Sequence, residues 1–599
     1  MRILAKVLIF NLLLAGKLFA QQTPYESGGK NVTATYEQCI SFYRQLCTQF
    51  SGITLEESGM TDAGFPLHLV LLGSERKPSL KKWHAENKCI LFINNGIHPG
   101  EPDGIDASML WVRDLLVQRA EGSIPDNIGI AIIPVYNIGG CLNRSPFQRV
   151  DQNGPEEFGS RGNSQNLDLN RDFIKCDSRE ARSFARLFHQ VDPDIFIDNH
   201  VSDGADYPYV MTMATTQHNK LGGPMGKYLH DVFEPALFEQ MRQKGFPMIP
   251  YVNVWGKDAS LGWKTFFDSP RYSSGFAALH NVFSFVPETH MLKPYPQRVE
   301  ATYTFMQSVL DYCRVHAEAI QSQREAMKQY QMQQQDFPLD WETSDSNYTP
   351  LEFQGYRYKK FKSGVSGLDY YSYDRQDTFR KTIPFYNFSF PTVAVKRPLA
   401  YVVPQGWWKV IELLQLNQVE MYALPEDDSI DIEAYQVKEF TSGERLFEWH
   451  HVINSMKLEK KCYRKKFRRG DWYIPLNQDK VRFIIEVLEP QGMDSYFYWN
   501  FFDPVLVQKE GYSEYSFEPL AADYLNQHPE VRTLLNEVIR AQPEKMKTAS
   551  AQLEFVYKHS PYAEPAWNEI PVFRVVNAAS CLRDFLELDR KPLGNKWDE

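Results

Sequence analysis

The feature that most constrains the fold is an alternation of short apolar runs with helical patterns between about residues 35 and 315. The run KCILFI is followed by a bend rich in glycine and proline and then by the helical pattern IDASMLWVRDLL. Similar apolar runs are IGIAIIPVYN, DIFIDNH and FSFVPETH, and a further helical pattern is ARSFARLFHQV. Strands that alternate with helices predict a parallel or mixed sheet covered by helices. We therefore expect an α/β fold with a mixed, mostly parallel sheet flanked by helices.

The pattern changes in the second half of this 599-residue chain, which is long enough for two or three domains. A helical pattern runs from Gln297 to about residue 330, and the Gln-rich, polar stretch after it resembles a linker. Short aromatic and β-branched runs follow, including VRFIIEVL, and residues 520–556 return to helical spacing. We therefore predict an α/β domain over 21–335, a linker over 336–350, and a β-rich domain with a helical tail over 351–599.

The N-terminus, MRILAKVLIFNLLLAGKLFA, has the composition of a secretory signal peptide. Arg2 and Lys6 precede an apolar stretch that ends at Ala20, where we expect cleavage. No later segment reaches the length of a transmembrane helix. The sequence predicts a secreted or periplasmic protein with no stable membrane insertion after cleavage.

Charge and cysteine content restrict which macromolecules and metal sites the sequence predicts. The net charge of −10 argues against nucleic acid, whose protein partners are usually basic. The basic cluster KKCYRKKFRRG, residues 460–470, predicts either a solvated hairpin or a contact patch for an anionic polymer. The eight cysteines include no CxxC pair, so a metal here would not be held by thiolates in zinc-knuckle spacing.

Polar side chains stand at three of the predicted strand ends. His98 and Glu101 lie in the bend NNGIHPGEPDG, His200 ends DIFIDNH, and Glu288 lies near the end of FSFVPETH. Ligands of open α/β sheets bind outside the carboxyl ends of strands. Two imidazoles and a carboxylate leave a zinc ion one open position, and a free carboxylate beside it can accept a proton from water. HxxE alone is short and frequent, but these elements in this order predict a catalytic zinc site.

A fourth element, NLDLNRDF, follows a long polar loop. Arg171 carries a rigid fork suited to clamping a carboxylate, although a surface ion pair is the alternative for an isolated arginine. Asp168 is placed to orient an imidazole that binds the metal.

These motifs resemble the zinc carboxypeptidases of the carboxypeptidase A type over residues 35–315. HPGE matches the family's HxxE, and the histidine of DNH matches its third ligand. The resemblance implies that His98, Glu101 and His200 bind one Zn²⁺ per chain. It implies that Glu288 is the general base, which also passes the proton to the leaving amine.

The remaining site residues are also implied by the resemblance. DLNRDF is similar to the family's DxNRN segment, which implies that Asp168 orients His98 while Asn170 and Arg171 hold the substrate's terminal carboxylate. RYSSG resembles the segment of the family's mobile tyrosine, with Tyr272 the candidate. For the arginine that stabilises the oxyanion, Arg161 and Arg149 both remain candidates, with Arg161 better placed relative to Asn170 and Arg171.

The sequence departs from the family pattern at Asp172, where an asparagine is usual, and in a short interval between Glu101 and His200. The layout of the chain as a whole looks like that of exported bacterial members of the family.

The implied function is that of a metallocarboxypeptidase acting on peptides with a free C-terminal carboxylate. Two alternatives remain: a zinc amidohydrolase acting on acylated amino acids or peptidoglycan peptides, and a non-catalytic binding module. The sequence predicts no particular oligomeric state. His290, two residues after the candidate base, is a further residue that could face the cleft.

Overall fold

A computed structural model describes residues 21–119, 122–255, 258–576 and 588–589. Its first half is built on a nine-stranded sheet in the order β1-β2-β4-β3-β5-β10-β7-β8, with β6 beside β10. The strands are β1 Ile53–Met60, β2 Pro66–Leu72, β3 Cys89–Asn94, β4 Ile128–Ile133, β5 Ile195–Asp198, β6 His200–Ser202, β7 Met211–Thr215, β8 Ile249–Pro250 and β10 Phe283–His290. The central strands β4, β3, β5 and β10 are parallel, whereas β1, β2 and β7 pair antiparallel. The predicted mixed, mostly parallel sheet is confirmed.

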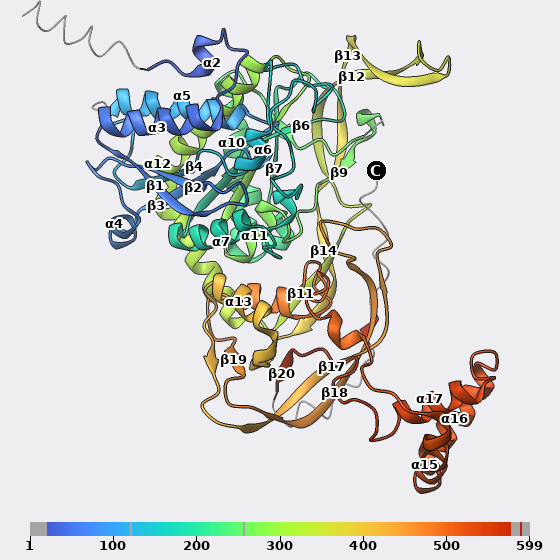
Figure 1. Cartoon of the computed structure of the whole chain (residues 1–599). Coiled ribbons are helices and arrows are strands. Elements are labelled where there is room, and N and C mark those ends of the chain that lie inside the picture. Colours follow the sequence, from blue (N-terminus) through green and yellow to red (C-terminus); the bar gives the residue numbers. More distant parts are fainter. Residues whose placement is uncertain (1–20, 120–121, 256–257, 577–587, 590–599) are drawn as a thin grey trace, which may run out of the picture.

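Helices cover both faces of this sheet, as Figure 1 shows. One face packs against α3 (Tyr36–Gln49), α5 (Asp103–Val117) and α12 (Tyr295–Gln333), and the other against α7 (Arg179–Val191) and α11 (Ser273–Leu279). Successive residues of a strand point to opposite faces. Leu91 and Ile93 of β3 accordingly belong to the first core, whereas Ile90 and Phe92 belong to the second. The central strands are therefore apolar throughout, which made them recognisable in the sequence.

The second half is rich in strands, as expected. The predicted helical tail is a helical segment inside this half, because two further strands follow its helices and join the last sheet. β11 (Asp336–Thr343) pairs with β14 (Ser389–Lys396), and β12 (Thr349–Lys362) forms a long hairpin with β13 (Asp369–Tyr386). A seven-stranded sheet follows, with the strands β15 Ala400–Val403, β16 Tyr422–Ala423, β17 Asp428–Ser442, β18 Ile453–Phe467, β19 Trp472–Pro475, β20 Phe573–Val575 and β21 Leu588–Asp589. The tail helices are α15 Glu514–Gln527, α16 Pro529–Ala541 and α17 Ala549–Lys558.

Two local expectations for this half were wrong. VRFIIEVL is helix α14 (Val481–Leu488), not a strand. Its β-branched residues favoured a strand, but Arg482 and Glu486 lie four residues apart and pair at 2.7 Å, a spacing typical of a helix. The first half of the predicted linker, 336–350, is strand β11. There, buried Phe337 and Leu339 alternate with more exposed residues, and this alternation was hidden by the polar composition of the stretch.

The basic cluster 460–470 continues strand β18 into its turn toward β19, and neighbouring acids neutralise much of it. Lys460 contacts Glu433 at 3.1 Å, and Lys465 contacts Glu569 at 3.0 Å. Arg468 contacts Asp427 at 2.8 Å. These pairs favour the solvated-hairpin interpretation.

The two halves share one hydrophobic core. Phe184 of α7 and Phe276 of α11 belong to the same buried cluster as Leu413 of α13 (Trp408–Leu416) and Ile485 of α14. Polar contacts cross the same boundary, since His189 Nε2 lies 3.1 Å from Asn417 Oδ1. The predicted domain boundaries stay a prediction, but the β-rich half covers an apolar face of the first.

The predicted signal peptide, residues 1–20, lies outside the described residues. Within the part of the chain that the structure describes, no helix is long and apolar enough to cross a membrane.

We expect a protein that ends at residue 335 to aggregate, because the truncation uncovers the apolar surface around Phe184 and Phe276. Size-exclusion chromatography with light scattering measures this. The control removes residues 511–563, whose helices have a separate core and whose flanks are close, with Lys509 N 2.7 Å from Glu564 Oε2. That control should stay soluble. A soluble, monomeric 21–335 protein would contradict the shared-core account.

Candidate metal centre and substrate cleft

The ends of strands β3 and β6 bring His98, Glu101 and His200 together. After β3 the chain bends sharply and α5 begins almost at once, so that HPGE lies across the end of the sheet. Gly104 allows this approach, because a Cβ on it would lie 2.5 Å from Cβ of Asn199. His200 is the first residue of β6. Both ligand-bearing segments therefore meet where ligands of such sheets bind.

The three side chains converge with ligand atoms that all lie within 4.8 Å of one another. Nδ1 of His98 lies 3.3 Å from Glu101 Oε1, and Nδ1 of His200 lies 3.0 Å from Glu101 Oε2. All three residues are buried. Two imidazoles and one carboxylate are one of the ligand sets that leave a tetrahedral zinc ion one open position.

The outer nitrogens of both histidines are bound to carboxylates. Nε2 of His98 lies 2.9 Å from Asp168 Oδ1, and Nε2 of His200 lies 3.0 Å from Asp198 Oδ2. Nδ1 of His98 has no hydrogen-bond partner although it is buried. A metal-binding histidine typically donates its other nitrogen to a carboxylate, which orients the ring toward the metal. The residues present therefore fit a zinc ion.

Sequence reasoning named Asp168 but missed Asp198. The signal was present in DNH, because residues two apart on an extended strand share a face. β5 and β6 are separated by a single residue, so Asp198 and His200 keep this relation.

Charges in the site keep the carboxylates of Glu101 and Asp168 ionised. Burial alone would raise the pKa of Glu101, but His98 and Arg149 hold that pKa well below its usual range. The pKa of Asp168 is likewise low despite burial, because His98 and Arg161 lie close to it. Both acids are therefore available as anions at neutral pH.

Glu288 stands beside the metal-ligand cluster. It pairs in parallel register with His200 on the neighbouring strand, and paired residues of adjacent strands project from the same face. Burial raises the pKa of Glu288 to about 8, and Glu101 contributes to this rise. A dication bound at the cluster would lower that pKa, since a nearby positive charge favours the carboxylate.

His290 does not face the cleft. Its side chain is fully buried, with Nε2 2.9 Å from the carbonyl oxygen of Ala205 and the ring against Tyr207. Burial lowers the pKa of His290 to about 4. The second histidine of the ETH motif is therefore a packed residue, and it is a poor candidate for the base.

The candidate carboxylate clamp lies on a short 3₁₀ turn, Leu169–Arg171. The guanidinium of Arg171 lies 4.5 Å from the ring centre of Tyr272, and Asn170 Oδ1 accepts a hydrogen bond from Ser273 N. The structure thus brings DLNR and RYSS together, as a joint role in binding requires. Tyr272 is itself buried.

Both candidate oxyanion arginines reach the cluster. Arg149 donates to Glu101 Oε1 at 2.8 Å and to the carbonyl oxygen of Val201 at 2.9 Å. Arg161 binds Asp168 Oδ2 at 2.9 Å and lies 3.6 Å from Glu101 Oε1. The side chain of Arg161 is 49% exposed, whereas that of Arg149 is 15% exposed. Arg161 is therefore freer to turn toward a substrate.

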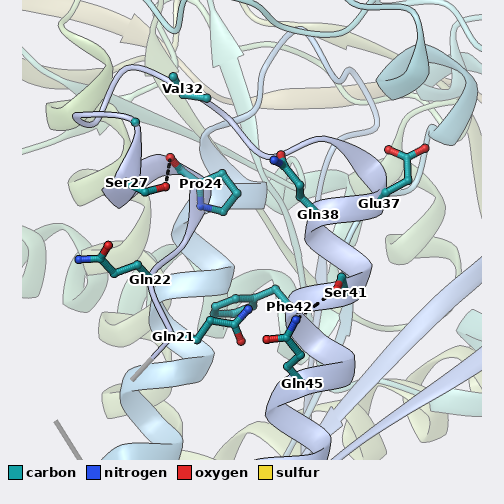
Figure 2. A pocket seen from close by; sticks show the side chains of 11 residues that line it. Gln21, Gln22, Pro24, Ser27, Val32, Glu37, Gln38, Ser41, Phe42 and Gln45 are labelled. Carbon is teal, nitrogen blue, oxygen red and sulfur yellow. Dashed lines mark hydrogen bonds between the residues drawn. The ribbon is translucent and has the colours of Figure 1, made fainter. Parts of the chain in front are cut away.

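One of two cavities adjoins the residues of the candidate site, and the other does not. A narrow one of about 30 Å³, room for about one water, lies beside β7 and is lined in part by Thr215, Tyr251 and Phe266. Phe266 also contacts the ring of Tyr272, so this cavity adjoins the clamp. The other cavity, of about 600 Å³, is lined by eleven residues between 21 and 45, four of them glutamines, and by none of the site residues. Figure 2 shows this lining.

The chain is similar to known carboxypeptidases at low sequence identity. The chain is 20% identical to carboxypeptidase 2 of Trichophyton rubrum over 493 residues, which are 78% of this chain and 84% of that protein. Carboxypeptidase 2 of Trichophyton tonsurans is 20% identical over 490 residues, with the same coverage. No protein-family model matches the chain.

Solved structures of carboxypeptidases share a lower sequence identity with this chain. A metallo-carboxypeptidase from Burkholderia cenocepacia is 17% identical with a TM-score of 0.35, covering 48% of this chain and 70% of that one. Carboxypeptidase A from Helicoverpa armigera is 14% identical with a TM-score of 0.36, covering 54% and 80%.

The geometry predicts one zinc per chain, lost on substitution of either histidine. We expect His98→Ala and His200→Ala to remove most of the metal, because each leaves only two ligands. Elemental analysis by mass spectrometry after purification measures this. His559→Ala, an exposed histidine of the tail, is the matched control. Full metal occupancy in the double variant would refute the assignment.

Proposed function

We propose that this chain, which resembles the zinc carboxypeptidases of the carboxypeptidase A type, is a zinc-dependent metallocarboxypeptidase that hydrolyses C-terminal peptide bonds. One arrangement carries the proposal. Carboxylates hold Nε2 of His98 and of His200, so that Nδ1 of each ring is directed toward Glu101. The partly exposed Glu288 lies beside them, in register with His200. Such a set suits catalysis rather than a closed structural metal site.

The proposed chemistry divides between the metal and the chain. Zinc, when bound by His98, Glu101 and His200, would supply a Lewis acid that polarises the scissile carbonyl and lowers the pKa of water. Glu288 accepts the proton of the attacking water and returns it to the leaving amine. Burial raises the pKa of Glu288, and a dication bound at the cluster would lower it again and favour the carboxylate that accepts the proton.

Substrate binding is assigned to the clamp. Asn170 and Arg171 hold the free C-terminal carboxylate of the peptide, since a guanidinium binds a carboxylate through two parallel hydrogen bonds. Tyr272 lies over Arg171 and would close on the bound residue. Arg161 is our first candidate for the developing oxyanion, with Arg149 the second.

We further propose that the protein is exported, with residues 1–20 as its signal peptide and peptides as its substrates. The net charge of −10 is unfavourable for nucleic acid. An amidohydrolase that acts on acylated amino acids or peptidoglycan peptides would use the same metal and clamp. Which substrates are hydrolysed distinguishes this alternative from a carboxypeptidase.

Glu288→Gln should keep zinc but lower turnover by about 10²–10⁴-fold, the usual contribution of positioned proton transfer. Steady-state hydrolysis of a free-acid peptide, with metal content measured in parallel, tests this. Glu300→Gln, an exposed acid on α12, is the control and should behave as wild type. Activity within a few-fold of wild type would place the base elsewhere.

The clamp predicts that peptides with an amidated C-terminus are poor substrates. Arg171→Ala should lower kcat/KM for free-acid peptides by about 10²-fold, because charge-assisted hydrogen bonds to the carboxylate are lost. The same change should barely affect amidated peptides. Mass spectrometry of a mixed peptide library, with exposed Arg179→Ala as control, distinguishes these outcomes. Equal cleavage of both forms by the wild type would instead indicate an endo-acting enzyme or another amidase.

A further inference from the structure

A turn of the C-terminal half reaches the segment that carries the clamp. It lies between β17 and β18, where Phe447 and His450 exchange two backbone hydrogen bonds of 2.9 and 3.0 Å across Glu448 and Trp449. Both central residues have positive φ, +47° for Glu448 and +71° for Trp449. Such turns favour Asn-Gly, so a Glu-Trp pair in this conformation is strained. The surrounding structure must hold the turn in place.

The tip of this turn binds the backbone of Asp168. Glu448 Oε2 accepts a hydrogen bond from Asp168 N at 2.9 Å. Asp168 is the residue whose side chain orients His98 and caps the short turn of Asn170 and Arg171. Glu448 therefore fixes the start of the segment that serves both the metal centre and the clamp.

The flanks of the turn are anchored to the first half. His450 Nε2 lies 2.9 Å from Asp177 Oδ2, six residues after Arg171. Phe447 packs against the guanidinium of Arg271, with Cζ 5.5 Å from the ring centre. These contacts on both sides of Glu448 keep its carboxylate directed at Asp168.

Arg271 forms the second link between the two halves. Its backbone nitrogen and Nε donate to the two carboxylate oxygens of Asp494, at 2.9 and 2.7 Å. Its guanidinium also lies 5.0 Å from a ring centre of Trp499. Both Arg271 and Asp494 are buried, and a buried charge without its partner is strongly unfavourable. Arg271 immediately precedes Tyr272, so the C-terminal half fixes the other wall of the clamp as well.

We propose that Glu448 and Asp494 are positioning residues of the active site. Together they set the separation between the Asp168–Arg171 segment and Tyr272, so that Asn170 and Arg171 meet the substrate carboxylate in one geometry. The inference rests on the proposed carboxypeptidase function and extends it, because the β-rich half becomes part of the substrate site. It also accounts for a strained turn at this place, since strain persists where the geometry serves a function.

The test compares three substitutions of Glu448. Glu448→Ala removes the acceptor, Glu448→Asp shortens its reach by one methylene, and Glu448→Gln keeps an oxygen that can accept from Asp168 N. We expect KM for free-acid peptides to rise by about tenfold in the Ala and Asp variants, with kcat within a few-fold and zinc content unchanged. The Gln variant should stay near wild type. Glu444→Ala, an exposed acid of the same loop, is the matched control.

Hydrogen exchange measured by mass spectrometry over residues 166–173 gives a readout independent of peptidase activity. Exchange at the amide of Asp168 should be faster in Glu448→Ala than in wild type and in Glu444→Ala. Should Glu448→Ala not fold, Glu448→Asp carries both measurements. Unchanged exchange together with unchanged KM overturns the positioning role. A wild type that cleaves no peptide defeats the proposed function instead, so the two failures are distinguishable.

Discussion

Two carboxylate–imidazole pairs, Asp168 with His98 and Asp198 with His200, are the contacts on which the rest of the site depends. Each carboxylate occupies Nε2 and turns Nδ1 inward, which fixes both the protonation and the direction of a ligand. Asp198 reaches its partner because it lies two residues away on a nearly continuous strand. Asp168 reaches His98 across 70 residues of sequence, so its position must be built by other contacts.

Those contacts come from both halves of the chain. Arg161 binds the carboxylate of Asp168, and Glu448 of the C-terminal half binds its backbone nitrogen. The residues that follow Asp168 form the proposed clamp. The contact between Asp168 and His98 therefore also fixes the position of Arg171. The β-rich half supports this arrangement through a shared core and through the Arg271–Asp494 pair. It thus supports the candidate site through buried contacts along α7, α11 and α14.

Much of the first half could be predicted because its signals are local. Apolar strands followed by bends and the helical spacing of α12 are both readable in short windows. The polar strand ends identified His98, Glu101, His200 and Glu288 by the same logic. Contacts between segments far apart in the chain produce no local sequence pattern. Nothing near Glu448 or Asp494 in the sequence indicates a partner some 220 to 280 residues away. The helix α14 was misread for a different reason, because its β-branched residues outweighed the helical spacing of Arg482 and Glu486.

The most direct test of the central claim is a crystal structure of the zinc-loaded protein with anomalous scattering recorded at the zinc edge. The account predicts one strong peak per chain, about 2.0–2.1 Å from Nδ1 of His98 and of His200, and about 2.0–2.2 Å from a carboxylate oxygen of Glu101. Nε2 of each histidine should remain on Asp168 and Asp198. A peak bound through Nε2, or one located away from the ends of β3 and β6, would contradict it.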